Sequence, residues 1–168
     1  MRRKLLIITS EFGKQGGGLS SSATQLANHL CDLGFRIEIV ISSQSKINEE
    51  FKRPNLKVIN DTIQVASGGY NSNLQRDLFF RGHLNNVSIQ QKDDLPELVF
   101  AFGAGLNGLF ASELSESLNA KLVVIPRGSE LNLATSNADL FYFNRKCFEK
   151  AVAIVSVSNE LLQRAKNI

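Results

Sequence analysis

Short apolar runs alternate along the chain with longer segments in which apolar residues recur every three or four positions. A short, nearly continuous apolar run is typical of a strand that is buried on both faces of a parallel sheet. Apolar residues at helical spacing predict amphipathic helices between such strands. The expected strands are Lys4–Thr9, residues 35–41, Leu56–Asn60, residues 97–102, Lys121–Ile125 and residues 151–157. The expected helices are residues 19–30, Asn73–Gln91, residues 106–118, residues 137–150 and a short helix after Ser158.

This alternation of strands and helices predicts the fold class. A strand, a helix and a second strand form a right-handed βαβ unit with a parallel strand pair. Repetition of this unit predicts an α/β domain, a Rossmann-like three-layer α/β/α sandwich with a mainly parallel sheet. The core-facing residues expected from the same spacing include Leu74, Leu78, Leu84, Leu140, Phe141, Cys147 and Phe148, and the expected capping residues are Ser20 to Ser22, Gly34 and Ser158.

Composition and charge narrow the class of protein. The 168 residues suit one domain, and a hydrophobic content of 43% is ample for a core. The net charge is +3 and the 19 basic residues are spread along the chain, which argues against a nucleic-acid partner but is compatible with an anionic small molecule or a membrane surface. Cys31 and Cys147 fall on apolar helix faces, so we expect buried free thiols and a reducing cytoplasm. No run approaches the ~20 apolar residues of a membrane span, and the apolar run at residues 5–8 is too short for a signal peptide.

Three polar or glycine-rich segments directly follow expected strands. They are the glycine loop after the first strand, residues 103–107 and residues 126–132. In an open α/β sheet, ligands bind beyond the carboxyl ends of the strands. Each segment also leads toward a helix, whose first N–H groups and dipole favour an anion. We therefore expect the binding chemistry of this protein at that edge of the sheet.

The glycine loop, EFGKQGGG, does not match a known nucleotide-binding loop. Its glycines, Gly13 and Gly16 to Gly18, lack the G-x-G-x-x-G spacing, and no acidic residue closely follows the second strand. No Gly-Lys-Ser/Thr sequence completes a P-loop. A flexible turn and a phosphate site are equally open interpretations of this segment.

The sequence PRGSELN at residues 126–132 carries the densest polar chemistry. Arg127 offers a rigid fork of donors that suits phosphate or sugar hydroxyls, and Glu130 can accept from hydroxyls or balance Arg127. The alternative is a surface salt bridge in a loop that leads into a helix. His29 and His83 are expected to be structural or solvated, and no His/Cys cluster has the spacing of metal ligands.

Four segments form an ordered series: EFGKQGGG with LGFRIEIVIS, then LPELVFAFGAGLNGLFA, LVVIPRGSELN and FEKAVAIVSVSNELLQRA. Together they resemble the amino-terminal half of family 4 retaining glycosyltransferases, which have the GT-B fold. The chain departs from the family pattern at Phe100 and Phe102, where many members carry histidines. It also departs at Arg127, where others have a histidine, and at Glu130, which replaces an aspartate.

The resemblance implies that residues 1–168 are the amino-terminal, acceptor-side domain of a GT-B enzyme. The carboxyl-terminal nucleotide-sugar domain with its Glu-x7-Glu motif would be absent, and no two glutamates of this chain have that spacing. The whole enzyme would transfer a sugar from a nucleotide-sugar donor to a saccharide or lipid-linked acceptor, in polysaccharide or glycolipid synthesis. It would retain the anomeric configuration and need no metal or cofactor, and the isolated domain would be inactive.

The resemblance, together with the position of the three segments, selects candidate site residues. Arg127 and Glu130 are the catalytic candidates, and the substrate-binding candidates are Gly16, Gly17, Gly18, Phe102, Gly103, Ser129 and Asn132. The partners would be the donor, the acceptor and the second domain, without nucleic acid. A lipid-linked acceptor would bring this cytoplasmic enzyme into peripheral contact with the inner face of the membrane. A non-catalytic nucleotide- or phosphate-binding module and a GT-B sugar epimerase domain are the alternatives.

Overall fold

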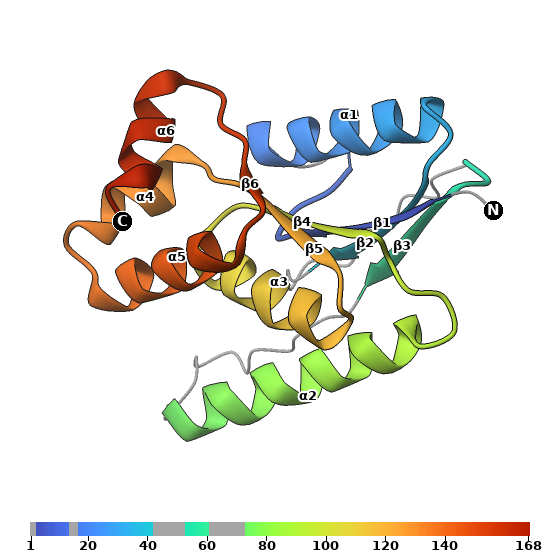
Figure 1. Ribbon diagram of the computed structural model, residues 1–168, viewed down its shortest axis with the longest axis horizontal. Helices are drawn as coiled ribbons and strands as arrows, with labels where there is room; N and C mark the ends of the chain where they lie inside the picture. Colours follow the sequence, from blue (N-terminus) through green and yellow to red (C-terminus); the bar gives the residue numbers. More distant parts are fainter. Residues whose placement is uncertain (1–2, 14–16, 42–52, 61–72) are drawn as a thin grey trace.

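A parallel sheet of six strands forms the middle layer of the protein (Figure 1). The computed structural model describes residues 3–13, 17–41, 53–60 and 73–168. The strand order is β3-β2-β1-β4-β5-β6, so the order switches direction between β1 and β4, where α/β sheets bind ligands. The strands are β1 (Lys4–Thr9), β2 (Arg36–Ile41), β3 (Leu56–Asn60), β4 (Leu98–Phe102), β5 (Lys121–Ile125) and β6 (Ala153–Ile154).

Helices cover both faces of the sheet (Figure 1). Helix α1 lies on one face, whereas α2, α3 and α5 lie on the other, and α4 contacts both α5 and α6 beyond the carboxyl end of β5. The helices are α1 (Gly18–Asp32), α2 (Asn73–Gln91), α3 (Gly105–Ser117), α4 (Gly128–Ala134), α5 (Ala138–Lys150) and α6 (Asn159–Lys166). The predicted three-layer, Rossmann-like sandwich is confirmed.

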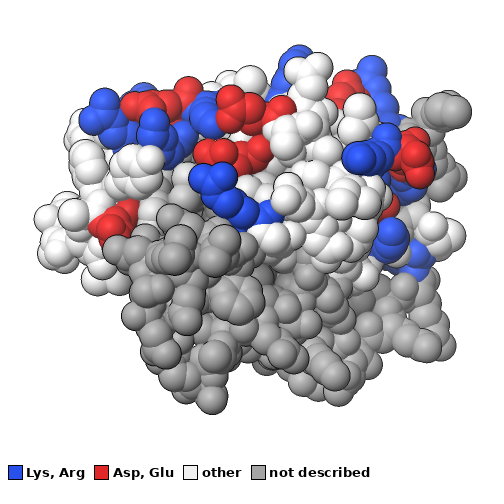
Figure 2. Space-filling model, turned by 90° about the horizontal axis from the view of Figure 1, so that it is seen from below, with Lys and Arg blue, Asp and Glu red and all other residues white. Residues whose placement is uncertain are grey.

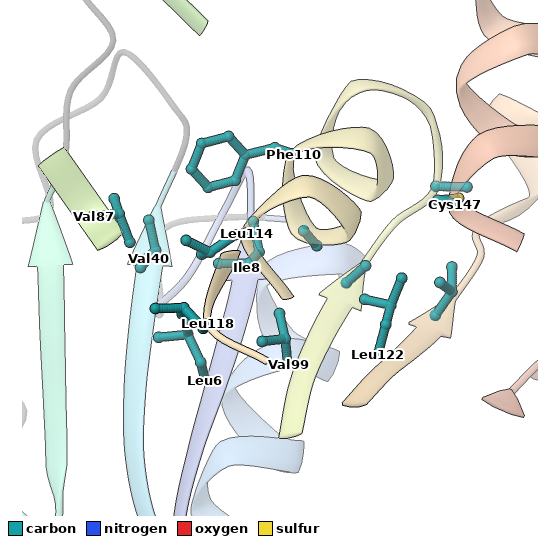
Figure 3. Packing of buried hydrophobic residues seen from close by; sticks show 14 of the residues in the cluster. Leu6, Ile8, Val40, Val87, Val99, Phe110, Leu114, Leu118, Leu122 and Cys147 are labelled. Atoms are coloured by element: carbon teal, nitrogen blue, oxygen red, sulfur yellow. The ribbon is translucent and has the colours of Figure 1, made fainter. Parts of the chain in front are cut away.

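Alternate residues of the central strands face the two helical layers. Leu6 and Ile8 of β1 point toward α3 and pack with Leu114 and Leu118 (Figure 3). Leu5 and Ile7 belong to the second apolar cluster, on the side of α1. Because both faces of β1 are buried, its sequence is a continuous apolar run rather than an alternating one.

The last predicted strand is too long. Residues 151–157 were expected to be extended and buried, but β6 comprises only Ala153 and Ile154. β6 pairs with β5 alone, at Val123 and Val124, and it is the last strand of the sheet. Val157 is 73% exposed at this edge. Its apolar side chain suggested a buried strand residue, but no described residue covers it.

The helix-facing predictions were partly wrong. Phe141 was expected to face the core but is 38% exposed, because Asn144 and Cys147 form the fully buried stripe of α5. Leu84 and Phe148 do pack against the core, as predicted. The predicted helix Asn73–Gln91 is confirmed, but the side chains of Leu74 and Leu78 lie outside the described residues.

Two of the three predicted helix caps are confirmed. Gly34 has a φ of +90° just after α1, and the Ser158 side chain accepts a hydrogen bond from Leu161 N at the start of α6. Ser20, Ser21 and Ser22 do not cap α1, because that helix already begins at Gly18 and its N-cap position provides no side-chain hydrogen bond.

The surface of the described residues is mixed in charge. Figure 2 shows acidic side chains beside basic ones on the described part of one face, in keeping with the small net charge of +3.

Cys31 and Cys147 are buried free thiols, as predicted. Burial is the main reason why the pKa of both thiols is raised, in Cys147 to about 12. Within the described ranges no helix is both long and apolar enough to cross a membrane.

Candidate functional site

A pocket of about 380 Å³ lies at the carboxyl edge of the sheet. Two of the three segments that the sequence placed at this edge line it directly, whereas the glycine loop contributes only through its flanking residues Ser10 and Leu19. The residues that line it are Ser10, Leu19, residues 102–107, Arg127, Ser129, Glu130 and Leu140. The pocket therefore lies at the β1/β4 switch point, the position at which α/β sheets bind ligands.

The segment between β1 and α1 is held by two hydroxyls of that helix. Ser20 Oγ donates to Gly13 O over 2.7 Å, and Gly13 N donates to Thr24 Oγ1 over 3.0 Å. Gly13 has a φ of +101°, which only glycine adopts without strain. This is the function of Ser20 that replaces the predicted cap. The start of the glycine loop is thus fixed to α1 on one wall of the site.

Gly17 and Gly18 are exposed, and neither lines the pocket. A Cβ atom added at either position would meet nothing within 4 Å. Packing inside the described protein therefore does not explain why these positions are glycine. Gly16 lies outside the described residues, so the proposed approach of a ligand to this loop stays a prediction.

The amino terminus of α3 is already occupied by protein groups. Ala104 N donates to Glu130 Oε1 over 2.8 Å, and Gly105 N donates to Asn144 Oδ1 over 2.6 Å. The Glu130 carboxylate thus lies where the sequence suggested a ligand anion. Gly103 and Gly105 have φ values of +112° and +60°, so this turn depends on glycine at both positions.

Arg127 contributes a cation to the pocket. Its guanidinium carbon lies 5.3 Å from the centroid of the Phe102 ring, a cation–π distance, and its side chain is half-buried. The Arg127 guanidinium makes no ion pair with a described residue. The predicted alternative, a surface salt bridge between Arg127 and Glu130, is therefore not the arrangement in the structure.

Glu130 connects the two loops. Besides Ala104 N, its Oε1 accepts from Arg127 N over 2.8 Å, and Ser129 Oγ donates to Oε2 over 3.0 Å. These bonds satisfy the N-cap N–H of α4 and fix the backbone of Arg127. The predicted catalytic role of Glu130 stays a prediction, whereas the contacts in the structure are those of a residue that positions its neighbours.

The structure brings together five of the predicted site residues: Phe102, Gly103, Arg127, Ser129 and Glu130. Asn132 lies outside the pocket, and its Oδ1 accepts from Arg164 of α6. His29 is exposed, and the buried ring of His83 lies 4.4 Å from the Phe110 ring. No group of three or more potential metal ligands occurs among the residues that the structure describes.

Helix α5 contributes Leu140 to the pocket and binds the start of α3, which the sequence did not predict. Leu140 lines the pocket, and Asn144, which is 0% exposed, bonds to the α3 terminus. The available signal was the spacing of Leu140, Asn144 and Cys147, which places an amide on the buried side of an otherwise apolar stripe. A polar group at such a position requires specific partners.

Helix α5 packs closely against α3 at Gly108 and Cys147. A Cβ atom added at Gly108 would lie 2.7 Å from Cys147 Sγ and 3.2 Å from Cys147 Cβ. We expect overpacking in Gly108→Ala to cost about 1–3 kcal/mol of unfolding free energy, offset in part by the higher helix propensity of alanine. Cys147→Ala in the same chain should relieve the contact, so a double-mutant cycle measured by urea unfolding should give a favourable coupling energy. Additive effects would show that the helices are not in close contact here.

Comparison with known proteins confirms the fold. No protein-family model matches the chain, and no curated protein matches it by sequence. Among solved structures, sucrose-phosphate synthase from Thermosynechococcus elongatus superposes with a TM-score of 0.75 and 11% identity. This match covers 99% of the present chain and 45% of the synthase, so the chain spans less than half the length of that protein.

Two further structures show the same arrangement. A protein assigned as a UDP-N-acetylglucosamine 2-epimerase from Listeria monocytogenes matches with a TM-score of 0.64 and 13% identity, over 99% of this chain and 42% of its own. TcCGT1, solved in complex with UDP, matches with a TM-score of 0.54 and 14% identity, over 84% of this chain and 32% of its own. At these identities the likeness concerns the fold alone. The chain has the fold of one Rossmann-like domain of a GT-B protein.

Proposed function

We propose that this chain is the acceptor-side domain of a retaining GT-B glycosyltransferase. The complete enzyme would transfer a sugar from a nucleotide-sugar donor to a saccharide or lipid-linked acceptor. The observation that carries the proposal is the Arg127 guanidinium, which lies over Phe102 in a pocket at the sheet's switch point, without an ion pair to a described residue. A cation held in this way is available to an anionic substrate group.

The remaining pocket lining suits a sugar. Ser10, Ser129 and Asn107 offer hydrogen-bonding groups, while Phe102 and the neighbouring leucines offer apolar surface. A sugar ring has the same combination, hydroxyl groups around its edge and C–H groups on its faces. Arg127 would stabilise the negative charge that develops on the leaving diphosphate, since positioned donors are the main source of such catalysis. The donor is a substrate, so this chemistry calls for no resident cofactor.

A second domain completes the proposed enzyme. The matched structures include a sucrose-phosphate synthase of more than twice the matched length and a complex with UDP. We propose that the corresponding domain here closes over the pocket and supplies most contacts to the nucleotide. The active site would then be the cleft between the domains, in the cytoplasm or at the inner face of the membrane.

The 168-residue chain alone is expected to release no nucleotide from any nucleotide sugar. It should also bind UDP more weakly than a Kd of about 1 mM in calorimetry, because it supplies only one wall of the cleft. The protein with its second domain should transfer sugar, with retention visible in the product's NMR spectrum. Micromolar UDP binding by the 168 residues would instead support the binding-module alternative. Inversion of a sugar carbon without transfer would support an epimerase.

A further inference from the structure

Asn144 is a fully buried amide whose two polar ends are both used beneath the pocket. Its side chain lies on α5 and is 0% exposed. Asn144 Oδ1 accepts from Gly105 N over 2.6 Å, and Asn144 Nδ2 donates to Glu130 O over 3.1 Å. A buried polar side chain that is satisfied at both ends favours one arrangement of its partners over all others.

These bonds are part of a closed ring. Asn144 holds the main chain of Glu130, the Glu130 carboxylate holds Ala104 N, and the adjoining Gly105 N returns to Asn144. The same carboxylate oxygen also accepts from Arg127 N over 2.8 Å. The ring therefore connects α5 with the loops that follow β4 and β5, and Arg127 is attached to it by its own backbone.

We propose that Asn144 is a positioning residue of the site, which acts through Glu130 to hold Arg127 over Phe102. The proposal rests on the proposed function only in treating Arg127 as the group that meets the substrate. Asn144 itself does not line the pocket. Without its bond to Glu130 O, the first turn of α4 loses a hydrogen bond to α5, and the Arg127 backbone can then shift with that turn.

The test uses NMR on the ligand-free 168-residue chain. Because the Arg127 guanidinium lies 5.3 Å from the Phe102 ring centroid, ring current should shift the Arg127 side-chain signals, and Phe102→Leu supplies the unshifted reference. In Asn144→Ala these signals should move most of the way to the reference. Asn144→Leu fills a similar volume but offers neither polar group, so it should give the same movement without leaving a cavity.

Asn137→Ala is the matched control. Asn137 directly precedes the same helix and caps it by accepting from Leu140 N, so its loss lowers stability without touching the ring of hydrogen bonds. Its Arg127 signals should stay at the wild-type positions. If the Asn144 variants melt at a lower temperature but keep the wild-type Arg127 signals, Asn144 is only a structural residue and the proposal is overturned. No substrate is used, so this outcome leaves the proposed sugar transfer untouched.

Discussion

Glu38→Ala should lower the free energy of unfolding by about 3–5 kcal/mol, because it removes the buried partner of the Lys4 charge. Lys4 Nζ lies 3.2 Å from Glu38 Oε2, and the two side chains are 3% and 9% exposed. Gln91 Nε2 of α2 donates to the same oxygen over 3.0 Å. The substitution therefore removes an acceptor from two buried donors. Lys4 Nζ keeps its bond to Asp94 O, 2.8 Å away, and its ion pair with Asp94 Oδ2, 3.5 Å away, which places the expected loss near the lower end of the range.

Urea unfolding of matched variants checks this expectation. Glu97→Ala removes a glutamate from a pair at the same end of β1, but Arg3 and Glu97 are 71% and 51% exposed and 3.5 Å apart. That variant should lose less than about 1 kcal/mol, as exposed pairs do. The double variant Lys4→Met with Glu38→Leu should recover only part of the loss, since an apolar pair avoids the cost of burying two charges but leaves Gln91 Nε2 without its acceptor. Equal losses from Glu38→Ala and Glu97→Ala would show that the Lys4–Glu38 pair is solvated.

The fold could be predicted from the sequence wherever both faces of a strand are buried. Residues 5–8 of β1 and 122–125 of β5 are all apolar because helices cover both of their faces, so these runs predict strands directly. The prediction failed at β6, where Val152 and Val155 are 62% and 51% exposed. These apolar side chains are not buried in the described structure, so the hydrophobic pattern predicted a strand longer than β6.

Helix α4 was not predicted from the sequence, for a different reason. Residues 126–132 were interpreted as a loop, yet a helix begins at Gly128. Its start depends on the Glu130 carboxylate, which accepts from Arg127 N and also from Ala104 N, 26 residues away. A capping interaction within four residues is visible in a sequence, but the second bond depends on the tertiary fold.

The candidate site was predictable in outline for the same reason. The topology of a parallel sheet brings the segments after β1, β4 and β5 to one edge, so the convergence of Phe102 and Arg127 follows from the strand order. The strand order does not predict which backbone N–H groups remain available to a ligand. Those of Ala104 and Gly105 are taken by Glu130 and Asn144, and Asn144 lies 39 residues from Gly105.

Arg127→Ala, in the protein with its second domain, should reduce kcat/KM for sugar transfer by about 100- to 1000-fold, the cost of losing one positioned donor to developing charge. The guanidinium forms no ion pair with a described residue, so the substitution breaks no internal salt bridge within the described structure. The guanidinium lies over the Phe102 ring. Arg127→Lys keeps the charge but loses the planar fork and its stacking, and should recover only part of the rate.

Arg145→Ala is the matched control for this experiment. Arg145 is an exposed arginine that pairs with Glu149 one turn along α5, so its removal changes the net charge equally without touching the pocket. It should leave kcat/KM within about twofold of the wild-type value, because exposed pairs contribute little. Initial rates with a nucleotide sugar, taken with thermal unfolding of each variant, separate lost chemistry from lost folding. Transfer at the wild-type rate by a folded Arg127→Ala protein would remove the cation from the mechanism and leave Arg127 as a packing residue over Phe102.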